Sequence, residues 1–317
     1  MEGTPSRMPR RFLLLILFAA ALPGGAAWAQ QAPNSGIVFR AEVSDVLVQA
    51  NVLDKHGRSV NDLPASDFTI YENGVRQKVD TFSHDDTPVS VGILVDNSGS
   101  MRPNVAAVDA AAMNFVRASN PQDEVFEVLF NDEYHLVAPF TNNVARLEEA
   151  LGSLDPDEGT ALYDTVIRAA AYLKRYGTRP KKVLLLITDG DDDASSHSLK
   201  QTLQIIQSQD APLIYCIGLT DKGEGGWFSR ESHKVLLQFA EDTGGVAYFP
   251  KNLRQVNAIT EKLARDIRLQ YSFVYRSNQT QPGYHTIRLE VKDPHLKHLH
   301  AYTRRGFYLP PAAAGNR

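Results

Sequence analysis

Three short segments of the sequence carry oxygen-bearing side chains of the kind that bind a metal ion. The first is Asp96-Asn97-Ser98-Gly99-Ser100, which places one carboxylate and two hydroxyls within five residues. The second contains Thr160 and the third contains Asp189, each beside a glycine. Hydroxyl and carboxylate oxygens suit a hard divalent cation such as Mg²⁺, which prefers oxygen ligands and keeps several waters. The candidate metal ligands are therefore Asp96, Ser98, Ser100, Thr160 and Asp189.

The elements around these segments are expected to bring them together. An almost unbroken apolar run, 89–95, leads into the first segment, and a second run, 183–187, leads into the third. Such runs are typical of strands that are buried on both faces of a parallel sheet. Thr160 precedes a helical pattern over 163–176. Since open α/β folds place ligands at the carboxyl edge of the sheet, all three loops are expected at that edge.

The centre of the chain alternates strand-like and helix-like patterns, which predicts a doubly wound, mostly parallel α/β sheet. Two of the strands are expected to form a hairpin around residues 131–133. The expected strands are 89–95, 124–130, 134–138, 183–187, 213–218 and 246–249, and the expected helices are 105–118, 144–154, 163–176, 198–209, 235–242 and 253–269.

Both flanks of this region alternate apolar and polar residues with a period of two, over 37–82 and again over 271–309. Each flank contains too few strands to be stable alone. We therefore predict that the N- and C-terminal segments pair in one small β-sandwich beside the central domain. The predicted divisions are 30–86 for the N-terminal β segment, 87–270 for the central domain, 271–311 for the C-terminal β segment and 312–317 for a tail.

The D-x-S-x-S, Gly-Thr and Thr-Asp-Gly elements, in this order, resemble the metal-ion-dependent adhesion site of von Willebrand factor type A (vWA) domains. The resemblance covers about residues 87–270. It implies that Ser98, Ser100 and Thr160 bind a cation through their hydroxyls, and that Asp96 and Asp189 bind directly or through waters. The cation expected is Mg²⁺ or Mn²⁺, with Ca²⁺ as an alternative. An Asp or Glu carboxylate of a protein partner often completes the coordination in this family.

The flanks add to the resemblance. The segment 67–77, with the sequence DFTIYENGVRQ, and the segment 305–308, with the sequence RGFY, are similar to bacterial secreted proteins grouped as VWFA-related. That group implies a fold and a site but no defined partner.

The N-terminus predicts export from the cytoplasm. Three arginines within residues 7–11 precede an apolar run, 12–22, and the small-residue pattern Ala27-Trp28-Ala29. This order is typical of a signal peptide, here residues 1–29 with cleavage after Ala29. The apolar run is short for a membrane span, which needs about 20 residues, and no later run is long enough. We therefore expect a secreted or periplasmic protein without an integral membrane segment.

Composition narrows the functions further. The hydrophobic fraction of 43% and the charged fraction of 22% are those of a globular protein. A formal net charge of -4 argues against general nucleic-acid binding, which requires a basic surface. The chain has one cysteine, Cys216, so no intramolecular disulfide forms, and its apolar surroundings predict a buried core residue.

Two acidic features near the candidate ligands allow more than one interpretation. The run Asp191–Asp193 either holds a second cation such as Ca²⁺ or forms a solvated loop that raises the local negative potential. Asp164 either orients the Thr160 loop from behind or caps or salt-bridges a helix.

Two further features also have alternatives. His295, His298 and His300 either bind a transition metal or lie on the surface of an edge strand. Trp227-Phe228 is either an exposed binding element or packs under a loop.

The residues do not favour an enzyme. Ser98 lacks the G-x-S-x-G context of a hydrolase nucleophile, and the chain has neither a phosphate-binding G-x-x-x-x-G-K-[ST] motif nor an H-E-x-x-H zinc motif. We expect a metal-dependent, protein-binding adhesion module outside the cytoplasm. The alternative is a structural or assembly component of the cell envelope without metal-gated binding.

Overall fold

The computed structural model describes residues 44–151, 159–208, 210–219, 230–293, 296 and 298–311. The predicted signal peptide, His295 and Trp227-Phe228 lie outside the described residues, so the expectations about them stay predictions.

The central sheet has six strands in the order β10-β9-β8-β5-β6-β7, and only β7 runs antiparallel to its neighbour. Its inner strands coincide with the apolar runs of the sequence, because helices cover both faces and leave no polar side. The predicted doubly wound α/β fold is therefore confirmed. The strands are β5 (Val89–Asp96), β6 (Glu124–Phe130), β7 (Tyr134–Thr141), β8 (Lys181–Thr188), β9 (Leu213–Gly218) and β10 (Ala247–Tyr248).

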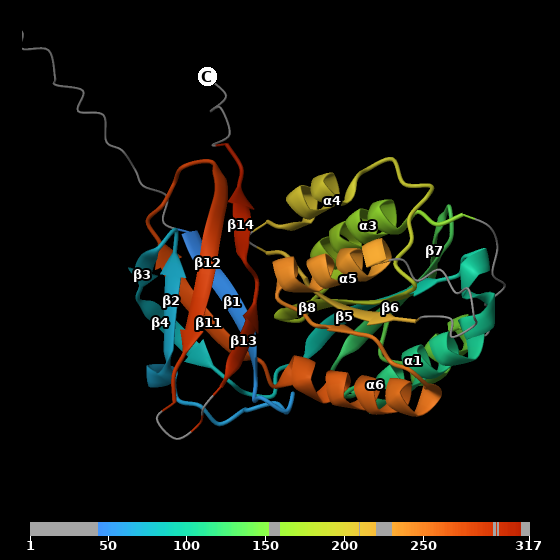
Figure 1. The fold of residues 1–317 in the computed structure, drawn as a ribbon, viewed down its shortest axis with the longest axis horizontal. Coiled ribbons are helices and arrows are strands. Elements are labelled where there is room, and N and C mark those ends of the chain that lie inside the picture. The colour runs from blue at the N-terminus through green and yellow to red at the C-terminus, as the bar shows by residue number, and fades with distance from the viewer. Residues whose placement is uncertain are drawn as a thin grey trace, which may run out of the picture. The chain divides into compact units, whose positions relative to one another are not determined.

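Helices lie on both faces of this sheet (Figure 1). One face packs against α1 (Val105–Ala118), α2 (Val144–Leu151) and α6 (Leu253–Arg268). The other packs against α3 (Leu162–Tyr176), α4 (Leu199–Ile206) and α5 (Arg230–Thr243). Alternate residues of a strand enter opposite cores, as with Ile93 and Leu94 in β5. Cys216 lies in the second core and is fully buried, as predicted.

Helix α5 begins at Arg230, five residues before the predicted start at Val235. Its first turn, Arg230–Lys234, is polar, so apolar periodicity does not reveal it. Ser232 in that turn is nevertheless buried, and its hydroxyl donates a hydrogen bond to Asp191. A tertiary contact thus extends the helix beyond its apolar stripe.

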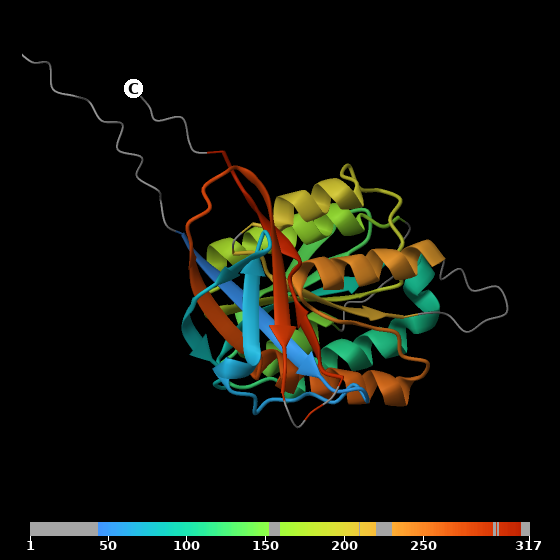
Figure 2. The same cartoon turned by 60° about the vertical axis from the view of Figure 1, so that its left-hand side comes forward.

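The two flanks form two four-stranded antiparallel sheets, β13-β1-β11-β4 and β14-β12-β2-β3 (Figure 2). Each sheet mixes strands from both ends of the chain, since β1 pairs with β11 and β2 pairs with β12. The predicted pairing of the flanks in one β-sandwich is therefore confirmed. The strands are β1 (Ser44–Leu53), β2 (Phe68–Glu72), β3 (Val75–Gln77), β4 (Val79–Ser83), β11 (Tyr271–Ser277), β12 (Gly283–Val291), β13 (His300–Thr303) and β14 (Gly306–Leu309).

The sandwich has its own hydrophobic core, built around aromatic side chains. Phe68 of β2 lies 4.8 Å from Tyr271 and 5.0 Å from Phe273, measured between ring centroids. Both β11 rings are fully buried. Burying such a side chain stabilises a fold by about 1.5–3 kcal/mol, so the two chain ends stabilise each other.

The sandwich is joined to the central domain through α6, and two residues separate the end of this helix from β11. The Lys181 ammonium at the start of β8 donates to the carbonyl of Arg268 at 2.5 Å and lies 3.4 Å from that of Gln270. The Tyr215 hydroxyl of β9 accepts hydrogen bonds from Asn51 and Gln270. Within the described ranges, no helix has the length and apolarity needed to cross a bilayer.

Candidate metal site

The candidate site lies where the sheet changes its direction of winding. Strand β5 lies between β6 and β8. After β5 the chain first adds β6 and β7 on one side of it and then adds β8, β9 and β10 on the other side. At such a point the carboxyl ends of the strands leave a crevice for a ligand. Asp96 ends β5 and Thr188 ends β8. The Thr188 hydroxyl donates to Asp96 Oδ2 at 2.5 Å and accepts the Gly190 N–H at 2.9 Å.

The loop after β5 brings two hydroxyls together directly above Asp96. The Ser98 N–H donates to Asp96 Oδ1 at 3.0 Å, which fixes the turn. The two hydroxyl oxygens of Ser98 and Ser100 are 3.0 Å apart. A short 3₁₀ helix, Gly99–Asn104, follows, and the Met101 N–H donates to the Ser98 carbonyl.

The other two loops supply Asp189 and Thr160. The half-buried Asp189 carboxylate accepts a hydrogen bond from Ser100, which joins the first and third segments. Thr160 is 5% exposed. Gly159 and Gly190 have φ values of +83° and +84°, so both turns need a glycine for a backbone that other residues adopt only with strain.

An open pocket of about 480 Å³ contains the three predicted hydroxyl-bearing residues. Asp96 is buried and accepts the Ser98 N–H, and Asp189 accepts a hydrogen bond from Ser100, which lines the pocket. The structure thus brings all five predicted residues to one edge of the sheet. The residues that line the pocket are Ser98, Gly99, Ser100, Arg102, Gly159, Thr160, Asp191 and Asp193.

Arg102, Asp191 and Asp193 line the pocket although the sequence did not assign them to it. Arg102 follows the D-x-S-x-S element by two residues, and no spacing rule identifies it. Thr188 was visible only as part of the Thr-Asp-Gly segment, and its role in holding Asp96 depends on the neighbouring strand.

The two predicted carboxylate ligands are costly to ionise in this environment. Burial and the negative charge of Asp189 raise the pKa of Asp96 to about 7, although hydrogen bonds from Ser98 and Thr188 oppose the rise. Burial also raises the pKa of Asp189, against a hydrogen bond from Ser100. Two carboxylates held close together away from water are stabilised by a nearby cation.

The side chains present fit a hard cation and not a soft one. The donors are hydroxyl and carboxylate oxygens, which Mg²⁺, Mn²⁺ and Ca²⁺ accept. Across the described ranges no three His, Cys, Asp or Glu side chains group as a metal site. The hydroxyls of Ser98, Ser100 and Thr160, with the carboxylates of Asp96 and Asp189, are the side chains that would hold a cation at this edge.

In the acidic run after β8, Asp191 and Asp193 are exposed and line the pocket, as a solvated loop that adds negative potential would; a second cation there stays a prediction. Each carboxylate accepts a hydrogen bond from within the protein: Asp191 from Ser232, Asp192 from the Tyr163 N–H at 3.1 Å, and Asp193 from the Thr160 N–H at 2.7 Å. The carboxylates of this exposed run therefore also connect loops and helices.

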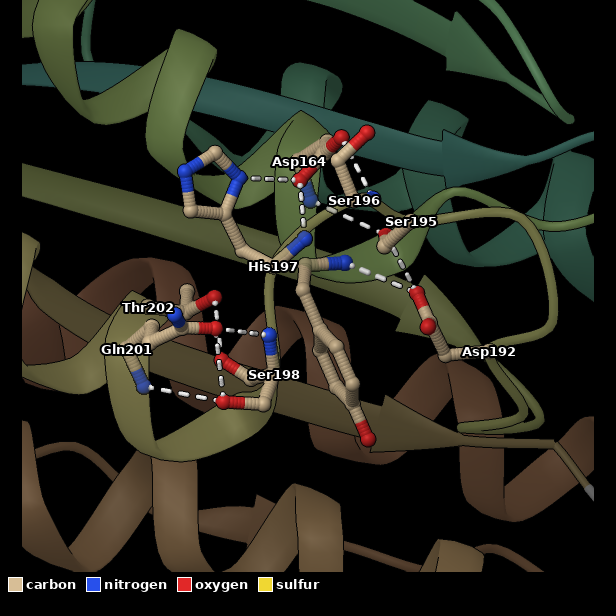
Figure 3. Close-up of polar contacts among 9 residues, drawn as sticks. Asp164, Asp192, Ser195, Ser196, His197, Ser198, Gln201 and Thr202 are labelled. Carbon is tan, nitrogen blue, oxygen red and sulfur yellow. Dashed lines mark hydrogen bonds and ion pairs between the residues drawn. The ribbon is translucent and has the colours of Figure 1, made fainter.

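Asp164 pairs with the loop before α4, which also carries the Asp193 side chain that binds Thr160, so the contact is compatible with either of its two proposed roles. Its carboxylate accepts the N–H groups of Ser196 and His197 and lies 2.7 Å from His197 Nδ1 (Figure 3). Burial tends to raise the pKa of Asp164, but these hydrogen bonds and the His197 charge lower it overall.

The described histidines of the C-terminal cluster lie on the surface. His300 begins β13, an edge strand, and both His298 and His300 are exposed. His300 thus agrees with the edge-strand interpretation, whereas His298 is exposed but lies before the strand.

Part of the central region matches a known family. Residues 91–191 match the family model of the von Willebrand factor type A domain. A search of curated proteins gives no significant match to the chain.

Several solved structures resemble the chain at low sequence identity. A von Willebrand factor type A protein from Catenulispora acidiphila is 15% identical, covers 84% of this chain and 75% of its own, and has a TM-score of 0.49. BatB from Bacteroides thetaiotaomicron is 16% identical over 56% of this chain and 98% of its own, with a TM-score of 0.45. The vWF domain of the type V pili tip protein Mfa5 from Porphyromonas gingivalis is 14% identical over 57% and 95%, with a TM-score of 0.47.

Proposed function

Because the chain carries a von Willebrand factor type A domain, we propose that its pocket binds a divalent cation, Mg²⁺ or Mn²⁺, and presents it to a carboxylate of a protein partner outside the cytoplasm. The observation that carries the proposal is the convergence of three hydroxyls and two carboxylates from three loops at one sheet edge. The predicted signal peptide supports the location.

The donor set explains how such a site would attract a carboxylate. When bound, the cation supplies an electrophilic position for a partner's oxygen. Ser98, Ser100 and Thr160 are neutral ligands, so they orient the cation without cancelling its charge. Asp96 is held by Thr188 and Ser98 at the floor of the pocket, where it supplies negative charge without filling the open side. Asp189, bound to Ser100, adjusts how much positive charge remains.

Calorimetric titration of metal-free protein tests the site itself. We expect about one equivalent of Mg²⁺ or Mn²⁺ to bind, and Asp96→Ala to weaken binding by at least about 100-fold, because it removes the more deeply buried of the two candidate carboxylate ligands. Asp45→Ala, which removes an exposed carboxylate of the sandwich, is the control and should bind like the wild type. Equal binding by wild type and Asp96→Ala would refute the metal assignment.

Capture of a partner tests the bridging role. We expect an envelope extract to yield a partner on immobilised protein with Mg²⁺ and to lose it with a chelator. Thr160→Ala should weaken partner binding at saturating Mg²⁺ more than it weakens metal binding, since the Thr160 hydroxyl helps to define the open side of the site.

A second candidate function is a structural or assembly role in the cell envelope without metal-gated binding. The sandwich favours it, because its two sheets are built from both flanks of the chain and contact the central domain through Asn51 and Tyr215. Partner capture that survives chelation would select this function over the first.

A further inference from the structure

The N-terminus of α3 lies beside the pocket and takes its capping groups from a distant part of the chain. Its own N-cap residue, Ala161, has no side chain that can accept a hydrogen bond. Asp192 instead accepts the Tyr163 N–H at 3.1 Å, and the Ser195 hydroxyl accepts the Asp164 N–H at 3.1 Å. Ser195 also donates to Asp192 at 2.5 Å (Figure 3). The loop after β8 therefore caps this helix, a contact that ordinarily comes from the N-cap residue itself.

The same loop binds the backbone of Thr160 from both sides. The Thr160 N–H donates to Asp193 Oδ1 at 2.7 Å. The Thr160 carbonyl in turn accepts the N–H groups of Asp193 and Ala194, each at 3.0 Å. Three hydrogen bonds thus join one candidate metal ligand to a loop that lies 33 residues further along the chain.

The far end of this loop is also fixed. Asp164 accepts two N–H groups and contacts the His197 ring, as described above (Figure 3). Ser198 and Gln201 then form a capping box at the start of α4. Since both ends are held, Asp193 lies in a restrained segment, and its contact with Thr160 restrains Thr160 as well.

We propose that Asp193 is a positioning residue that sets the backbone of Thr160, so that the Thr160 and Asp189 loops act as one unit in cation binding. The proposal rests on the proposed function and concerns how the position of Thr160 in the same site is set. Asp189 begins the loop and Asp193 lies four residues later, so a shift of one candidate ligand is passed on to the other through the hydrogen bonds to Thr160.

A purely electrostatic role is the competing explanation, because Asp193 lines the pocket and carries a negative charge. Two substitutions separate the roles. Asp193→Asn removes the charge but keeps an oxygen that accepts the Thr160 N–H, whereas Asp193→Ala removes both. Asp191→Asn is the matched control, since it removes a charge from the same pocket and keeps an acceptor for Ser232.

The experiment is calorimetric titration of the full-length mature protein and the three variants with Mn²⁺ and with Mg²⁺. We expect Asp193→Asn and Asp191→Asn each to weaken binding by about threefold, as the loss of one solvent-screened charge does. Asp193→Ala should weaken binding at least about tenfold. Equal losses in Asp193→Asn and Asp193→Ala would overturn the positioning role and leave only the charge.

Amide hydrogen exchange on metal-free protein measures the restraint on Thr160 directly. It therefore tests the role of Asp193 even if the protein binds no cation. In peptides that span residue 160, exchange should be faster in Asp193→Ala than in the wild type and nearly unchanged in Asp193→Asn. Absence of cation binding by the wild type would refute the proposed function, while the exchange data would still decide whether Asp193 restrains Thr160. Unchanged exchange in Asp193→Ala would overturn the inference.

Discussion

The two edges of the central sheet both contain carboxylates that are at least partly removed from solvent, but their pKa values are shifted in opposite directions. At the amino edge, Glu124 accepts hydrogen bonds from Ser90 and from the N–H and hydroxyl of Thr178, at 2.6–2.8 Å. Burial alone would raise the pKa of Glu124, but these hydrogen bonds and the Arg179 charge lower it. At the carboxyl edge, the pKa values of Asp96 and Asp189 are both raised.

The difference shows that the surroundings decide whether a carboxylate is stabilised as an anion. A carboxylate surrounded by donors is stabilised as an anion and fixes its loops. Asp96 also accepts hydrogen bonds from two donors, but burial and the charge of Asp189 outweigh them and raise its pKa. Ionising Asp96 therefore costs free energy, and a bound cation would offset that cost. The amino edge therefore holds its carboxylate by internal hydrogen bonds, and the carboxyl edge carries the buried negative charge on which the proposed cation site depends.

Glu127 gives the largest expected effect, because it shows what burial does to a carboxylate that has no hydrogen-bond donors among the described residues. It is fully buried in β6, at an irregularity in the pairing with β7, and neither of its carboxyl oxygens has a hydrogen-bond partner among the described residues. Burial raises its pKa to about 8. The folded state therefore holds a proton that the unfolded chain loses above about pH 4.5, and stability falls as the pH rises towards 8.

We expect Glu127→Gln, which cannot ionise, to remove this loss. The free energy of unfolding of the variant minus that of the wild type should increase by roughly 3 kcal/mol between pH 5 and pH 8. Urea unfolding at several pH values measures it. A difference that does not change with pH would show that ionisation of Glu127 has no cost, contrary to the comparison.

Asp189→Asn tests the carboxyl edge. In metal-free protein at pH 7 we expect it to raise the free energy of unfolding by about 1 kcal/mol, because it removes a charge that repels Asp96. The sign follows from the raised pKa values, which make the ionised forms a cost that increases with pH. Saturating Mg²⁺ should stabilise the wild type more than the variant. A destabilised metal-free variant would contradict the assignment of this edge to binding.

Glu124→Gln makes the equivalent change at the amino edge and should have the opposite sign. We expect it to lower the free energy of unfolding at pH 7 by up to about 1 kcal/mol, a modest value because solvent partly screens the side chain. The lowered pKa means that the ionised group stabilises the fold above about pH 4.5 and loses this effect on acidification. The two proteins should therefore converge in stability at low pH, and Mg²⁺ should not alter their difference.

Much of the fold was predictable because local patterns of apolar and polar residues indicate its strands and helices. The buried runs 89–95 and 183–187 became β5 and β8, and the alternation in the flanks became the sandwich. The five candidate ligands were also predictable, since each follows a strand or precedes a helix that local spacing reveals. That they hold a metal remains a proposal.

Other features depend on contacts between residues that are distant in sequence. The early start of α5 accompanies the contact between Ser232 and Asp191, 41 residues apart. The contact of Asp164 with His197 and the contacts of the acidic run with Thr160 and Tyr163 likewise join residues 29 to 33 positions apart. A carboxylate in a sequence has no fixed role, because its role depends on which donors surround it.

The sequence by itself determined the element order, the pairing of the chain ends and the set of oxygen ligands, because apolar periodicity and loop position are local properties. Only the tertiary structure decided which carboxylates are stabilised as anions and which are not. Hydrogen bonds and burial set that balance, and both arise when parallel strands bring loops such as those of Thr160 and Asp193 together.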